Sequence, residues 1–94
     1  MKAENDKEFF ERADAYITLA NEQAANVNRG KVSASMMFAL ARFNAWVSAS
    51  GTESGDELAS VKEEALTYFV KEYRQMLEEN LDEYIEHFDD YMKA

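Results

Sequence analysis

The sequence predicts an all-α domain, an antiparallel bundle of three helices, and three observations point to this class. The 94 residues include no Pro and only three Gly, so nothing breaks a helix from residue 1 to 28 or from 56 to the end. Apolar residues make up 47% of the chain, which suits a folded core. Most of them recur at the three- and four-residue spacing of amphipathic helices. We therefore expect one helical domain over residues 1–94.

The first helix is expected over residues 6–28, with Asn5 or Asp6 as its N-cap. Gly30 is expected to end it in the left-handed conformation that glycine adopts easily. The apolar residues form a single stripe, which is typical of a helix packed on a core: Phe9, Phe10, Ala13, Tyr16, Ile17, Ala20, Ala24 and Val27.

The second helix is expected over residues 32–50, with Ser33 as its N-cap. Between residues 36 and 47 it has no polar side, because only Arg42 and Asn44 are polar there. A helix that is apolar nearly all round must be covered nearly all round. Two neighbouring helices leave one side open to a fourth helix or a second subunit, and we predict a homodimer. The residues on that side are Phe38, Ala41 and Ala45.

The third helix is expected over residues 56–92, and Ser54 with Glu57 forms a capping box at its start. One continuous helix would be roughly 55 Å long, against about 28 Å for the second helix. Two outcomes remain open. The helix breaks near Asn80, where a second capping box begins, and a short fourth helix folds back. Alternatively it continues, and its extension packs against another copy of the chain.

Several polar residues lie at apolar positions and are candidate buried or interface-specifying groups. Arg42 lies between Phe38 and Trp46, and Asp14 is its candidate partner. The arginine either forms an internal ion pair, reaches solvent, or specifies an anion or an interface. Asparagines buried in helical assemblies often set register or oligomeric state. The asparagines concerned are Asn21, Asn44 and Asn80.

An acidic ridge is predicted near the C-terminus, because four carboxylates are spaced by four residues: Glu78, Asp82, Glu86 and Asp90. It is either a solvated face or a docking face for a basic protein; a cation site and a nucleic-acid mimic are further alternatives. His87, the only histidine, has Glu83 and Asp90 nearby, but Tyr84 stands where a di-iron bundle would need a ligand. We expect no metal, no cofactor and no catalytic residues.

The composition limits the classes of binding partner and the cellular location that we expect. The net charge of −9 disfavours binding to nucleic acid or to anionic lipid. There is no Cys, no apolar signal core at the start, and no apolar run near the roughly 20 residues of a membrane span. A cytoplasmic protein fits best.

The function itself stays open at this level. The residues favour a small non-enzymatic interaction or adaptor module that works as a homodimer, with a basic protein as a possible partner. The alternative is a small-ligand-binding protein or an enzyme, with a pocket around Arg42, Asn44 and Asp14.

Three segments carry a resemblance to a known family: residues 12–23, 41–46 and 73–84. They read RADAYITLANEQ, ARFNAW and YRQMLEENLDEY. In them the chain resembles a small proteobacterial family known as a domain of unknown function. The resemblance implies a short intracellular helical protein, and it brings no activity, cofactor or site residue with it.

Overall fold

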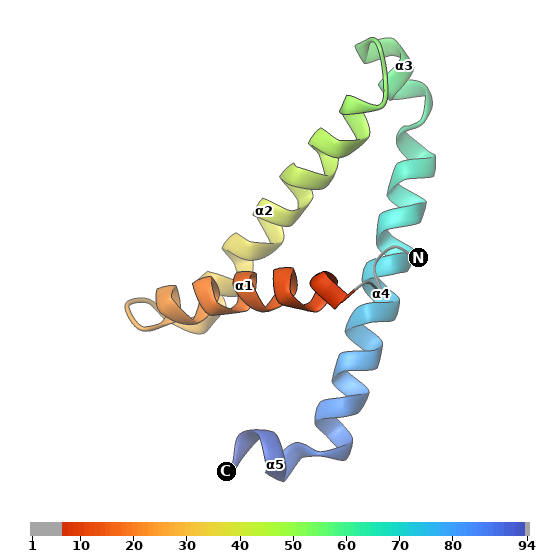
Figure 1. The fold of residues 1–94 in the computed structure, drawn as a ribbon. Coiled ribbons are helices and arrows are strands. Elements are labelled where there is room, and N and C mark those ends of the chain that lie inside the picture. Colours follow the sequence, from red (N-terminus) through yellow and green to blue (C-terminus); the bar gives the residue numbers. More distant parts are fainter. Residues whose placement is uncertain (1–6, 94) are drawn as a thin grey trace. The chain divides into compact units, whose positions relative to one another are not determined.

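The computed structural model describes residues 7–93, which contain helices and no strands (Figure 1). The all-α class is therefore confirmed. The helices are α1 (Lys7–Ala24), α2 (Arg29–Ser50), α3 (Gly55–Ser60), α4 (Lys62–Glu86) and α5 (Phe88–Met92). The chain divides into two units, residues 1–47 and 48–94, with the boundary in the last turn of α2. Each unit is described by itself, and the single domain stays a prediction.

In the first unit, a short turn at residues 25–28 joins α1 to α2. The expected caps Asn5 and Asp6 lie outside the described residues. α1 ends at Ala24, earlier than residue 28, and the N–H groups of Asn26 and Val27 donate to the Gln23 carbonyl at 3.0 and 3.2 Å. This turn therefore closes the first helix without any help from a glycine.

Asn28 caps α2, so the expected caps at this junction were wrong. The Lys31 N–H donates to Asn28 Oδ1 at 2.9 Å, which satisfies one of the unpaired donors of the first turn. α2 therefore begins at Arg29, ahead of Ser33. Gly30 lies inside that first turn, and no glycine between residues 7 and 93 has a positive φ. The left-handed helix end predicted at Gly30 does not form.

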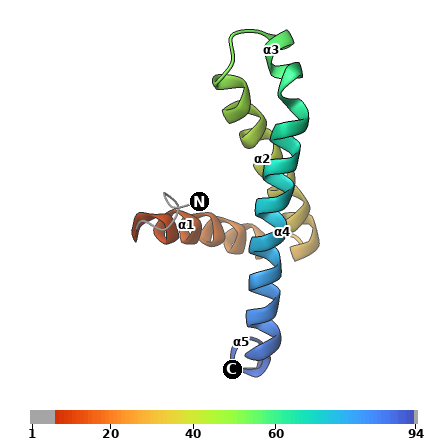
Figure 2. The same cartoon turned by 90° about the vertical axis from the view of Figure 1, so that its right-hand side faces the viewer.

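Burial in the first unit is confined to the start of α2. Val32 is 7% exposed and is the buried residue among those described. It lies in the first turn of α2, next to the junction with α1. From this junction the two helices diverge, as both Figure 1 and Figure 2 show. The remainder of α2 is thus left uncovered by α1.

In the second unit, the capping box predicted at Ser54 is confirmed. The Glu57 N–H donates to Ser54 Oγ at 3.1 Å, and the Glu57 carboxylate accepts from the Glu53 N–H at 2.8 Å. The helix that follows is short. It ends at Val61 (φ −109°, ψ 9°), where the Ser60 hydroxyl donates to the Glu57 carbonyl at 2.6 Å. The predicted continuous helix from residue 56 is therefore wrong at Val61. The Ser60 hydroxyl competes with a backbone N–H for the Glu57 carbonyl, and this interrupts the helix.

α4 runs through Asn80 without a break. Of the two open outcomes, the break near Asn80 with a fourth helix starting there is therefore wrong. The Asn80 side-chain amide donates to the Met76 carbonyl at 2.8 Å, one turn back. This bond is compatible with a helix interior, whereas an N-cap needs non-helical backbone. The break comes instead at His87 (φ −115°, ψ 34°), whose N–H donates to the Glu83 carbonyl at 3.0 Å. The five-residue α5 follows this bend.

Candidate functional site

The largest exposed apolar surface of the first unit belongs to α2. Three of its aromatic side chains are well exposed: Phe38 at 67%, Phe43 at 60% and Trp46 at 64%. Phe43 and Trp46 stack with ring centroids 5.9 Å apart. Phe38 and Phe43 lie about 140° apart around the helix axis at 100° per residue. The exposed surface therefore surrounds much of the helix, as expected for a segment without a polar side.

Arg42 lies on this surface and is itself exposed. Asp14, its candidate partner, is exposed on α1, and no ion pair joins the two side chains in the part of the chain that the structure describes. Asn21 is exposed on α1, whereas Asn44 is half-buried on α2. The structure thus does not bring Arg42 and Asp14 together as an internal pair, and the pocket around them stays a prediction.

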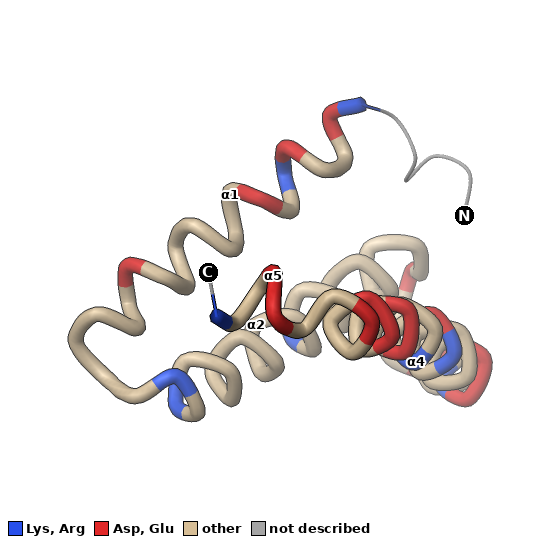
Figure 3. Tube along the Cα trace, turned by 90° about the horizontal axis from the view of Figure 1, so that it is seen from below, with Lys and Arg blue, Asp and Glu red and all other residues tan. Residues whose placement is uncertain are grey.

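Acidic residues concentrate on α4 and α5. Figure 3 shows them in red along both helices, whereas α2 carries none. Glu78, Asp82 and Glu86 follow one ridge of α4, and all three are exposed. Asp90, the fourth member of the predicted ridge, lies on α5, beyond the bend at His87. The ridge on α4 therefore has three members rather than four.

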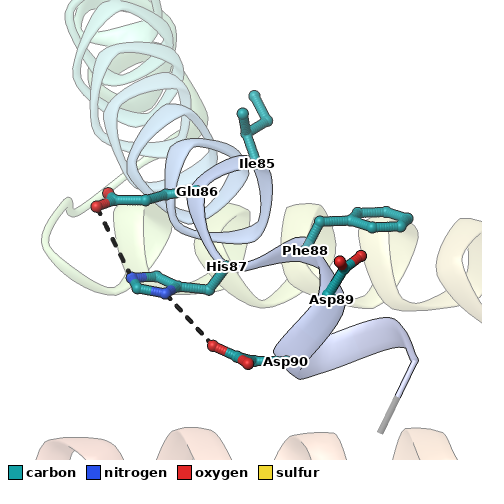
Figure 4. A pocket seen from close by; sticks show the side chains of 6 residues that line it. All are labelled: Ile85, Glu86, His87, Phe88, Asp89 and Asp90. Carbon is teal, nitrogen blue, oxygen red and sulfur yellow. Dashed lines mark ion pairs between the residues drawn. The ribbon is translucent and has the colours of Figure 1, made fainter.

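The bend between α4 and α5 forms a shallow, open pocket lined by residues 85–90 (Figure 4). In it the His87 ring lies between two carboxylates, with Nδ1 3.6 Å from Asp90 and Nε2 3.9 Å from Glu86. These contacts become ion pairs when the histidine is protonated. Within residues 7–93 no group of three or more His, Cys, Asp or Glu side chains is arranged to hold a metal ion. The pocket is the concave side of a bend.

Two tyrosines pack across the same bend. The Tyr91 hydroxyl donates to the Glu83 carboxylate at 2.9 Å, and the Tyr84 and Tyr91 rings stack with centroids 4.3 Å apart. The hydrogen bond to the negatively charged Glu83 raises the pKa of Tyr91 above its ordinary value. Sequence reasoning missed this contact, because a partner eight residues away across a break has no helical periodicity. It holds α5 against the end of α4.

The described side chains include large apolar groups on exposed helix faces. The only histidine contacts carboxylates, and no serine or threonine hydroxyl is hydrogen-bonded to it within the described residues. What the structure offers instead is large apolar side chains on exposed helix faces, bordered by charge. Such surfaces are typical of protein–protein contacts. No helix in residues 7–93 combines the length and the hydropathy that crossing a bilayer requires.

Comparison with known proteins places the chain in a family. The family model described as protein of unknown function (DUF3144) matches residues 9–85, so the chain belongs to this family. An NMR structure of the protein NB7890A from a Shewanella species is 41% identical over 94% of each chain, with a TM-score of 0.78. No curated protein matches. The predicted family of unknown function is confirmed.

Proposed function

We propose that this member of the DUF3144 family is a non-enzymatic protein-interaction module that works as a homodimer. The antiparallel arrangement of the three long helices α1, α2 and α4 within each copy stays a prediction. The observation that supports the dimer is the exposure of Phe38, Phe43 and Trp46 on a helix without a polar side. Contiguous apolar surface of this kind on a small protein marks an interaction site, because leaving it in water is unfavourable.

One neighbouring helix cannot cover both sides of α2. Phe38 and Phe43 lie about 140° apart around the axis, and α1 diverges from α2 beyond the junction near Val32 (Figure 1). In a three-helix bundle each helix has two neighbours, so a third side of α2 stays open. Ala41 and Ala45 border Phe38 on that side, and small side chains permit close approach of another helix.

A second copy of the chain suits this opening. It is present wherever the protein is present, and a two-fold interface uses the same surface of both subunits. A dimer also displays each of its remaining surfaces twice. It can therefore hold two copies of a partner with higher avidity than a monomer, which is how an adaptor works.

The test is the molar mass in solution, measured by light scattering during gel filtration at several concentrations. We expect twice the chain mass of 10.8 kDa. Phe38→Glu should shift the mass towards the single chain, because it places a charge in the interface. The matched control is Thr18→Glu, on the side of α1 opposite its apolar stripe, and it should leave the dimer intact. A single-chain mass for the natural protein at every concentration would overturn the proposal.

A further inference from the structure

The geometry points to a specific interface: α2 of one copy packs against the C-terminal half of α4 of the other copy. This inference rests on the proposed homodimer and names its contact surfaces. The cationic face of α2 comprises Lys31, Phe38, Arg42, Ala45 and Trp46. The acidic face of α4 comprises Leu77, Leu81 and Ile85 with the neighbouring Glu78, Asp82 and Glu86. Two-fold symmetry makes this contact occur twice in the dimer.

α2 carries positive charge and no negative charge. Its 22 residues include Arg29, Lys31 and Arg42 but no carboxylate. Lys31, Phe38 and Arg42 lie within about 40° of one another around the helix axis. Neither Lys31 nor Arg42 forms an ion pair within the described residues, and both are exposed. This face therefore combines a large aromatic side chain with two cations that have no carboxylate partner.

The C-terminal half of α4 has the complementary character. Leu77, Leu81 and Ile85 are exposed by 43%, 53% and 72%, and they follow one another along a single apolar line. Each is followed directly by a carboxylate, so an acidic line lies about 100° further round the helix. Residues 77–93 hold seven carboxylates, against Lys93 and His87. An apolar line beside a negative line fits an apolar helix that carries cations.

The same charges argue against a contact between the acidic faces of two copies. That arrangement would bring both groups of seven carboxylates together, and like charges across an interface are strongly unfavourable. The cationic face of α2 is a basic surface that suits the acidic ridge, and in the proposed dimer a second copy supplies it. In this arrangement Arg42 acts as an interface-specifying residue.

The surfaces are large enough for a stable interface. A stable protein–protein contact buries on the order of 1,200–2,000 Å² in total. Phe38 and Trp46 from both copies contribute four aromatic side chains, each about two thirds exposed in the single chain and so able to bury roughly 100–160 Å² more. The six aliphatic side chains at positions 77, 81 and 85 of the two copies add to this area.

The test uses two charge-reversed forms of the full chain, separately and mixed. One form carries Asp82→Lys and Glu86→Lys, and the other carries Lys31→Glu and Arg42→Glu. Each form alone should dimerise at least about tenfold more weakly than the natural chain, because like charges then face each other. An equimolar mixture should regain the dimer, since each altered face then meets an opposite charge. Native mass spectrometry distinguishes the mixed dimer by its mass.

The matched control reverses two carboxylates on the polar side of α1, with Glu11→Lys and Glu22→Lys. It changes the net charge as much as the first form does and should leave the dimer unchanged. Two reversed forms that each dimerise normally, or a mixture that stays monomeric, would overturn the inference. If these results came with a dimeric natural chain, the homodimer would stand and only its assigned surfaces would fail. A monomeric natural chain would overturn both.

Discussion

α2 and the C-terminal half of α4 are both exposed helical segments, but charge is distributed differently on them. On α2 the apolar side chains surround the axis and no carboxylate is present. On α4 between residues 77 and 86, apolar side chains occupy one side and carboxylates the other. The first pattern requires protein on every side, and the second requires it on one side only. In the proposed dimer, α2 therefore lies at the centre of the assembly and α4 selects the partner by charge.

The strongest test of this contrast is to truncate one large side chain on α2 and one outside the proposed contact. Trp46→Ala should lower the free energy of unfolding by about 3–5 kcal/mol, because the proposed dimer buries this ring. Met92→Ala, on α5 and outside the proposed contact, should change it by less than about 0.5 kcal/mol. Both side chains are exposed in the single chain, at 64% and 59%. Urea denaturation at fixed protein concentration measures the two values. If both variants lost an equally small free energy of unfolding, α2 would not lie at the centre of the assembly.

Replacing two asparagines extends the comparison to changes in unfolding free energy of about 1 kcal/mol or less. Asn28→Ala removes the side-chain acceptor of the α2 N-cap and should cost about 1 kcal/mol. Asn80→Ala replaces a residue inside α4 by a better helix former, and it should be neutral or stabilising by a few tenths of a kcal/mol. Thermal unfolding followed by circular dichroism compares the two. A cost near 1 kcal/mol at Asn80 would indicate that this residue caps a helix or specifies an interface.

The smallest expected effect concerns the bend after α4. The raised pKa of Tyr91 means that the bent structure favours the neutral phenol, whose O–H donates to Glu83. The contact is therefore complete below about pH 10, the ordinary pKa of tyrosine, and is lost as the pH rises through the raised value. Glu83→Gln should move the pKa of Tyr91 down towards its ordinary value. Carbon-13 NMR of the Tyr91 ring, in the natural chain and in the Glu83→Gln variant, measures the difference in pKa.

Local features of the fold could be predicted from the sequence alone. The capping box at Ser54 and Glu57 depends on two side chains within one turn, and it forms as predicted. The uninterrupted helix through residues 36–47 follows from the lack of Pro and Gly in that stretch. The exposed carboxylates of the ridge follow from their spacing by four. In each case the decisive groups are neighbours in the sequence.

Other features involve a choice between nearly equivalent residues. Asn28 and Ser33 are both good N-caps, and Asn80 is followed by the sequence of a capping box. The energy differences between such alternatives are a few tenths of a kcal/mol to about 1 kcal/mol. Likewise, no Pro or Gly marks the helix breaks at Val61 and His87 in the sequence. Short-range pattern reasoning cannot separate alternatives this close in free energy.

By itself, the sequence determined the helical class, the position of the nearly all-apolar segment and the concentration of acidic residues near the C-terminus, because residue type and spacing dictate these directly. Only the tertiary structure decided that Asn28 caps α2, that α4 passes through Asn80, and that α4 ends at His87. The physical reason is that a helix boundary depends on which of several donors and acceptors pair in three dimensions. Tyr91 and Glu83 show this most clearly, since the bend itself brings them within 2.9 Å.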